Sequence, residues 1–104
     1  MDSDKILDEI AEDLSARGAT MGSMFGSRAL KHGTTAFACV KDGVFAAKLG
    51  AGTPEHAAAL ALPGAERFDP AKRHAPFKDW VALPVEQAEH WPLYAEAALD
   101  HLDE

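Results

Sequence analysis

Residues 34–49 read TTAFACVKDGVFAAKL, two runs of small and apolar residues joined by Asp42-Gly43. Asp-Gly between apolar runs predicts a two-residue hairpin turn, because both central residues of a type I′ turn need a positive φ angle. The preceding run, 24–31, ends at His32-Gly33, a weaker signal of the same kind. The stretch therefore predicts a three-stranded antiparallel meander over residues 24–31, 34–41 and 44–49.

The N-terminal segment has the pattern of an amphipathic helix. Its apolar residues recur at helical spacing, at Ile6, Leu7, Ile10 and Leu14. Arg17 and Gly18 then supply a basic last turn and a stop. We therefore predict a helix over residues 4–17, followed by a connection at residues 19–22.

Prolines divide the chain after the meander. Thr53-Pro54 supplies an N-cap and an N1 proline for a short helix over residues 54–62. Residues 65–79 contain two prolines among many charges, which predicts a loop with at most a brief strand near Arg67-Phe68.

The last quarter of the chain adds one strand and more helix. Residues 80–83 are apolar and end at Pro84, which predicts a strand. Pro92 has no N–H donor, so we expect a short segment over 85–90 and a final helix over 92–102. The predicted fold class is α+β: an antiparallel sheet built on the meander plus the late strand, with an N-terminal helix, a short middle helix and C-terminal helices.

The composition indicates an ordinary globular domain. The 104 residues are 47% hydrophobic and 26% charged, and we expect a single domain over 1–104. Cys39 is the only cysteine, which excludes an intramolecular disulfide and a Cys-based zinc ribbon and favours a cytoplasmic location. The sequence shows no signal-peptide pattern and no apolar run of the roughly 20 residues that a membrane span requires.

The charges are sorted along the chain. Residues 1–16 carry a net charge of −5, residues 17–78 carry +5, and residues 79–104 carry −7. Such a chain either balances its charges internally, helix against sheet, or presents a basic surface to an anionic partner.

The predicted turns also assign residues to the two faces of the meander. With two-residue turns at His32-Gly33 and Asp42-Gly43, residue 28 opposes residue 37, and residue 37 opposes residue 48. Helix 4–17 is expected to cover the more apolar face, with Phe25, Ala29, Ala36, Ala38, Val40, Phe45, Ala47 and Leu49. The other face then holds Leu30 and Lys41 beside a row across three strands, Arg28, Phe37 and Lys48.

The row has two interpretations. Basic residues around an aromatic residue resemble the surface by which sheets bind single-stranded nucleic acid, with Lys72, Arg73 and Lys78 as additional cations. Alternatively, the acidic residues of 85–104 cover the row, so that Glu86, Glu89 or Glu96 pairs with Arg28 or Lys48. The final helix either covers the row or joins helix 4–17 on the core face.

No pattern predicts a catalytic, cofactor or metal site. Gly50-Ala51-Gly52 begins like a dinucleotide fingerprint, but Glu55 occupies the third glycine position, where a pyrophosphate would lie. The five histidines lack metal-ligand spacing. Cys39, between Ala38 and Val40, is expected to be a buried hydrophobe, and an enzyme would need Cys39 or His74 to meet a carboxylate in a pocket.

Several short motifs resemble one protein family. Met24-Phe25-Gly26, the return Gly43-Val44-Phe45-Ala46 with Lys48 after it, and Pro76-Phe77 followed by Trp80-Val81-Ala82-Leu83-Pro84 resemble the N-terminal domain of the TfoX competence regulators, also called Sxy. The order of elements is also similar to that of small MmcQ/YjbR-type domains. The TfoX resemblance implies a non-enzymatic regulatory domain without cofactors, and we expect it here without the regulators' second domain.

Three functional hypotheses follow. The leading one is a binding or regulatory module, monomeric or homodimeric, that acts through contacts with a protein partner. The second is anion or nucleic-acid binding by the row of Arg28, Phe37 and Lys48. The third is a small enzyme of unknown reaction.

Overall fold

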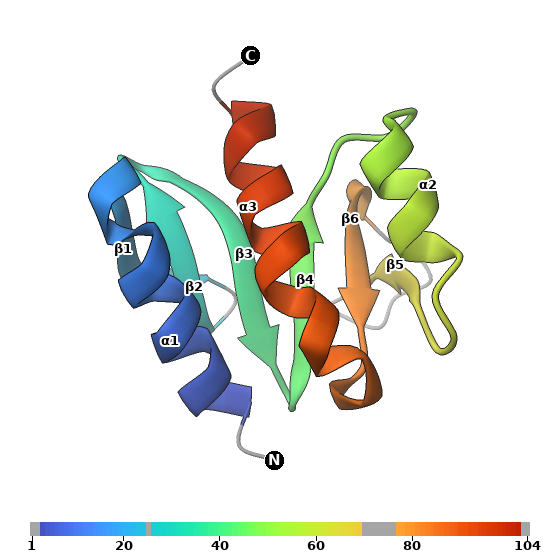
Figure 1. Cartoon of the computed structure of the whole chain (residues 1–104), viewed down its shortest axis with the longest axis horizontal. Coiled ribbons are helices and arrows are strands. Elements are labelled where there is room, and N and C mark those ends of the chain that lie inside the picture. Colours follow the sequence, from blue (N-terminus) through green and yellow to red (C-terminus); the bar gives the residue numbers. More distant parts are fainter. Residues whose placement is uncertain (1–2, 25, 70–76, 103–104) are drawn as a thin grey trace.

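The computed structural model of the chain describes residues 3–24, 26–69 and 77–102 (Figure 1). Its elements occur in the order α1 (Ser3–Leu14), η1 (Ser15–Arg17), β1 (Ala19–Met24), β2 (Ser27–His32), β3 (Thr35–Lys41), β4 (Val44–Lys48), α2 (Pro54–Leu60), β5 (Glu66–Phe68), β6 (Phe77–Leu83), η2 (Val85–His90) and α3 (Trp91–Leu102), where η marks a 3₁₀ helix. This order confirms the predicted α+β class.

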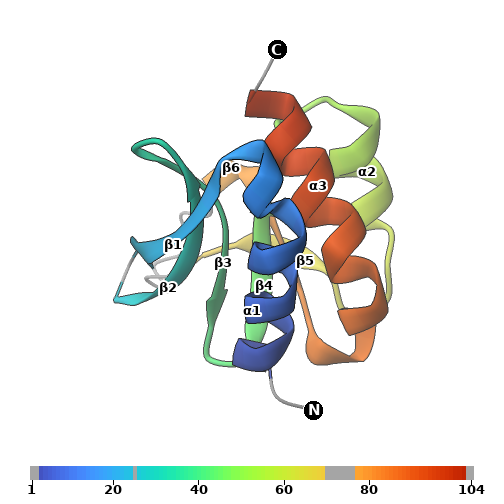
Figure 2. The same cartoon turned by 60° about the vertical axis from the view of Figure 1, so that its left-hand side comes forward.

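The strands form one antiparallel sheet in the order β1-β2-β3-β4-β6-β5. Figures 1 and 2 show α1, α2 and α3 together on one side of this sheet. The final helix therefore joins α1 on the same face, which was one of the two predicted arrangements. In the part of the chain that the structure describes, every helix is too short or too polar to cross a membrane.

The residues predicted as a connection at 19–22 belong instead to a strand. β1 pairs with β2 along its whole length, and Met24 and Ser27 flank the turn. The predicted strand over 24–31 is therefore two strands around Gly26, whose φ is 72°. Small and polar residues suit β1 because it is an edge strand, which packs less surface than a central strand.

One hairpin turn was predicted correctly and the other was displaced. Lys41 pairs with Val44 across a turn whose central residues, Asp42 and Gly43, have φ angles of 54° and 79°. The β2–β3 turn lies one residue later than predicted, because the last paired residues are His32 and Thr35. This places Gly33, with a φ of 64°, at the first central position, where a type II′ turn requires glycine.

The remaining predicted elements are present with shifted ends. Thr53 caps α2 by accepting a hydrogen bond on Oγ1 from the backbone N–H of His56, at 3.1 Å. The brief strand near Arg67-Phe68 is β5, and the late strand begins at Phe77 rather than at residue 80. Helix α3 begins at Trp91, so Pro92 lies in its first turn, where a missing N–H costs nothing.

A β-bulge changes the faces of the meander. β2 and β3 pair regularly as far as Leu30 and Ala38, after which the register shifts and Lys31 pairs with Ala36. Phe37 is therefore an extra residue in β3. Both Phe37 and Ala38 pack in the core under the helices, where strict alternation would have placed one on each face.

The predicted division of β2 and β3 between the two faces was consequently wrong in part. Leu30 belongs to the core under the helices, whereas Ala29 and Ala36 pack on the opposite side. Phe25 lies outside the described residues. The assignments of Ala38, Val40, Phe45, Ala47 and Leu49 to the core face were correct.

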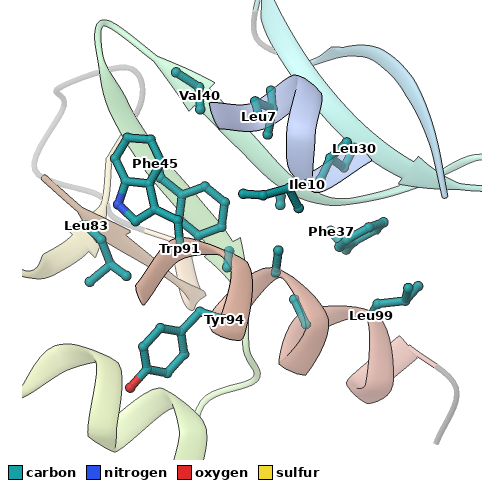
Figure 3. Close-up of a cluster of buried hydrophobic side chains, with 14 of the residues drawn as sticks. Leu7, Ile10, Leu30, Phe37, Val40, Phe45, Leu83, Trp91, Tyr94 and Leu99 are labelled. Carbon is teal, nitrogen blue, oxygen red and sulfur yellow. The ribbon is translucent and has the colours of Figure 1, made fainter. Parts of the chain in front are cut away.

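The main core lies between the sheet and the helices (Figure 3). From α1 it receives Leu7, Ile10 and Leu14, and the fourth residue predicted to face the sheet, Ile6, is partly buried against it. At its centre the Trp91 ring stacks on Phe45, with ring centroids 5.3 Å apart. The Trp91 indole also donates a hydrogen bond to the Pro84 carbonyl, at 3.2 Å.

Candidate interaction surface

The predicted row does not form, because its members lie on different sides of the sheet. Arg28 is on the side of α1, where its guanidinium pairs with the Asp8 carboxylate and donates a hydrogen bond to the Asp4 carbonyl at 3.4 Å. Phe37 is fully buried on that side as well, near Ile10 and Leu99 (Figure 3). Arg28 and Phe37 therefore do not offer a partner a basic and aromatic surface.

The opposite side of the sheet is termed the helix-free face, because none of the described helices packs on it. Its core is a smaller cluster that contains only strand residues: Ala29, Cys39, Ala46, Phe68, Trp80 and Ala82. Four of them continue one row of directly paired residues across β2, β3, β4 and β6: Ala29, Cys39, Ala46 and Ala82. Their small side chains leave the larger residues around them to form the surface.

Those larger residues include three lysines, one on each of the strands β2, β3 and β4, and a fourth lysine lies on β6. Lys31 and Lys41 lie two residues from Ala29 and Cys39, and alternation places them on the same face. Lys48 pairs directly with Trp80 and so lies on the same face, and Lys78 lies two residues before Trp80, where the pairing of β6 with β5 is irregular. The first three lysines are half-buried and Lys78 is exposed.

The aliphatic parts of these side chains take part in the packing. The Lys31 stem lies across Gly22 of the neighbouring strand, where a Cβ atom would come within 2.5 Å of the lysine Cδ. Such packing leaves an ammonium group at the edge of an apolar cluster, the usual arrangement of a lysine on a sheet surface. We term Lys31, Lys41, Lys48 and Lys78 the lysine set.

Acidic residues are scarce on the described part of this face. The positions that β2, β3, β4 and β6 direct toward it include no Asp or Glu. Asp79 points away, and its carboxylate accepts a hydrogen bond from the Ala51 N–H at 2.9 Å. Glu66 of β5, which pairs with Ala82, is an acidic residue at the margin.

Charge is therefore divided between the two layers of the fold. The described helices carry ten acidic and two basic side chains, whereas the strands carry six basic and two acidic ones. Part of the charge is balanced internally, through Arg28 with Asp8 and through Arg17 with Asp100 at 2.6 Å. The acidic partner of Arg28 thus comes from α1, whereas the prediction had been a partner from residues 85–104.

Of the other residues considered for chemistry, Cys39 lies on the helix-free face, His56 lies on α2, and His74 is outside the described residues. Cys39 is buried as predicted, and burial raises the pKa of its thiol to about 12, opposed in part by the nearby Lys41 charge. His56 is also buried, and its Nε2–H donates a hydrogen bond of 2.8 Å to the Lys78 carbonyl. Among the described residues, no group of three or more His, Cys, Asp or Glu side chains is placed to hold a metal ion.

The predicted surface is thus only partly reproduced. Lys41 and Lys48 lie on one face as expected and Lys78 is exposed on β6, while Lys72 and Arg73 lie outside the described residues. Lys31 was not predicted, because the expected register placed it on the core side. A register that allowed for a bulge near residues 36–37 would have placed Lys31 on this face, but a run of apolar residues carries no signal for a bulge.

Comparisons of the chain with protein-family models, with curated proteins and with solved structures found no match. The resemblance to the TfoX N-terminal domain therefore stays a prediction from the sequence. A functional proposal has to be argued from the surface itself.

Proposed function

We propose that this chain is a non-enzymatic binding or regulatory module that binds an acidic segment of a protein partner on its helix-free face. The observation that carries the proposal is the lysine set: four lysines on four neighbouring strands, with no acidic residue directed to that face from the described part of those strands. The resemblance to the TfoX regulators supports the same class of function. The single cysteine supports a cytoplasmic location.

The geometry of the lysine set suits an extended acidic segment. Neighbouring strands lie about 4.8 Å apart, and alternate residues of an extended peptide lie about 6.6–7 Å apart, so carboxylates of such a peptide could meet several lysines in turn. The half-buried stems restrict the lysine side chains before binding, which reduces the entropy lost on binding. Positive charge gathered on one face also speeds the encounter with an anionic partner.

Nucleic-acid binding is the second candidate, because phosphates would be attracted by the same lysines. The sheet surface of a single-strand binding module adds exposed aromatic rings on which bases stack. Here Phe37 is 0% exposed and Trp80 is 6% exposed, so neither offers a free ring face. Phe77, which is 38% exposed and makes an edge contact with Phe68, is an exposed ring at one end of β6. Any such binding would therefore depend mainly on phosphate contacts, and this favours the acidic protein segment.

A direct test compares two anionic probes on the purified chain. We would titrate it into a fluorescent deca-glutamate peptide and into a fluorescent single-stranded oligo-dT, and measure anisotropy at low and moderate salt. We expect the peptide to bind, with an affinity that falls as salt rises. Lys41→Glu combined with Lys48→Glu should weaken binding about tenfold or more.

The control variant changes the same charges elsewhere. Lys5→Glu combined with Arg67→Glu alters two exposed basic residues on α1 and β5 and should change the affinity less than about twofold. Equal losses in the two variants would show attraction by net charge alone and would contradict a specific surface. Tighter binding of oligo-dT would replace the acidic segment with nucleic acid, and binding of neither probe would count against the lysine set as a binding surface.

A further inference from the structure

The two edges of the sheet are built differently. At one edge β5 has only three residues, two of them, Glu66 and Arg67, charged and exposed. Its pairing with β6 is irregular between Arg67 and Phe68. Short length, charge and irregular pairing are the features by which natural sheets prevent another strand from adding to an edge.

The other edge lacks all three features. β1 has six residues, ATMGSM, with no charged residue and no proline. It pairs with β2 at every residue from Ala19 to Met24 without a bulge. Figure 1 shows β1 as the outermost strand on the side away from β5, and none of the described strands pairs with its outer side. A regular, neutral edge of this length is a template for one more strand.

The β1–β2 hairpin determines which backbone groups point outward. Met24 and Ser27 flank a two-residue turn and therefore exchange both backbone hydrogen bonds with each other. Because this direction alternates along an antiparallel strand, Thr20, Gly22 and Met24 direct their N–H and C=O groups toward β2. The N–H and C=O groups of Ala19, Met21 and Ser23 point away from β2. Ala19 is only 7% exposed, so the accessible groups on this side are those of Met21 and Ser23.

We propose that β1 pairs with β1 of a second copy of this chain, antiparallel about a two-fold axis at Met21. In this register Met21 opposes Met21 of the second copy, and Ala19 opposes Ser23 of the second copy. The Met21 pair then forms two backbone hydrogen bonds between the copies, and each Ser23 lies opposite the Ala19 end of the other strand. The two sheets join into one continuous sheet with the helices of both copies on the same side.

The side chains of β1 support a second copy as the partner. Met21, at the proposed axis, is one of the few exposed large hydrophobic residues of the described chain, with 38% of its surface accessible. It would lie against its own counterpart and lose part of that exposure. No charged side chain lies on β1, so self-pairing opposes no like charges across the strands, which a charged edge would do.

The proposed interface uses a different surface from the lysine set, and salt separates the two. Each copy carries a net charge of −7, and pairing through β1 brings the acidic α1 helices closer together. Added salt screens this repulsion and should strengthen pairing, whereas it weakens binding of an acidic peptide to lysines. Each proposal can therefore fail without the other.

The first test is sedimentation velocity over a series of concentrations. We expect a monomer–dimer equilibrium with a dissociation constant on the order of 10–100 μM. Met21→Lys places two ammonium groups at the axis and should weaken the dimer at least about tenfold. Ser23→Pro removes an outward N–H that β2 does not use and should weaken it similarly. Ala58→Lys, at an exposed position of α2, adds the same charge far from β1 and should leave the dissociation constant of the dimer unchanged.

A cross-linking test fixes the register. In the proposed pair the two Met21 Cα atoms are about 5.5 Å apart, within the range of about 4.4–6.8 Å that a disulfide spans. Met21→Cys should therefore form a disulfide-linked dimer under mild oxidation. Ser23 is also exposed but lies roughly 14 Å from its counterpart along the strand, so Ser23→Cys should not form this dimer. The native Cys39 is buried and should not interfere.

The outcomes decide the proposal. Circular dichroism and the melting temperature would first establish that each variant is folded. A chain that stays monomeric at about 1 mM overturns the proposal, as does a dimer that survives both Met21→Lys and Ser23→Pro. Equal cross-linking of Met21→Cys and Ser23→Cys would overturn the register, and binding of a foreign extended peptide without self-association would replace the second copy as the occupant.

Discussion

Replacing Phe37 with alanine tests the β-bulge, because the regular register places this ring on the surface of the sheet. In the structure Phe37 is 0% exposed and packs in the core under α1 and α3. Truncating a fully buried phenylalanine removes its apolar contacts and leaves a cavity, which typically costs about 3–5 kcal/mol. A domain of this size has a free energy of unfolding of about 5–15 kcal/mol, so the loss is a large part of the total.

The matched control is Phe77→Ala. Phe77 is 38% exposed and makes an edge contact with Phe68 at a centroid distance of 6.4 Å, so we expect a loss of only about 1 kcal/mol. Chemical denaturation followed by tryptophan fluorescence would measure the free energy of unfolding of both variants, since neither substitution removes a tryptophan. The melting temperature should fall by roughly 15–25 °C for Phe37→Ala and by about 5 °C for Phe77→Ala. If Phe37→Ala costs about 1 kcal/mol or less, the bulge and the burial of Phe37 are wrong.

Two smaller effects follow from the same structure. A double-mutant cycle of Arg28→Ala and Asp8→Ala should give a coupling free energy below about 1 kcal/mol, because the two side chains are 40% and 55% exposed. The coupling should decrease in high salt, and a coupling above about 2 kcal/mol would contradict a surface ion pair. Cys39 should resist alkylation near neutral pH until the chain is unfolded, since its pKa is raised from 9.0 to about 12. The neutral Cys39 thiol contributes fully to the free energy of unfolding below pH 9.0, and this contribution is lost as the pH rises toward 12. The free energy of unfolding of the wild type should therefore fall relative to that of Cys39→Ala between these pH values. Equal pH profiles of the two proteins would contradict this expectation.

Local sequence signals predicted most of the elements. The Asp42-Gly43 turn is where the sequence placed it, because positive φ angles at both central residues restrict the choice of residues. The start of α2 follows from the Thr53-Pro54 pair in the same way. Strand β1 was not predicted, because its small and polar residues resemble a connection. Its strand conformation comes from pairing with β2.

The candidate surface was harder to predict, because it depends on register. One extra residue at Phe37 places that ring under the helices and leaves Arg28 on the side of α1. The same shift brings Lys31 to the face that carries Lys41 and Lys48. Strand residues alternate with a period of two, so a bulge changes the face of the residues on one side of it.

The sequence by itself determined the α+β class, the helical periodicity of residues 4–17, the β3–β4 turn and the division of charge along the chain. These features arise from interactions between residues close in sequence, or from composition. Only the tertiary structure decided that the helices share one face, that Phe37 is buried and that three lysines gather on the opposite face. The reason is physical: the faces of a strand are assigned by pairing and packing with residues distant in sequence, and the burial of a large ring outweighs the cost of a local irregularity in the ladder.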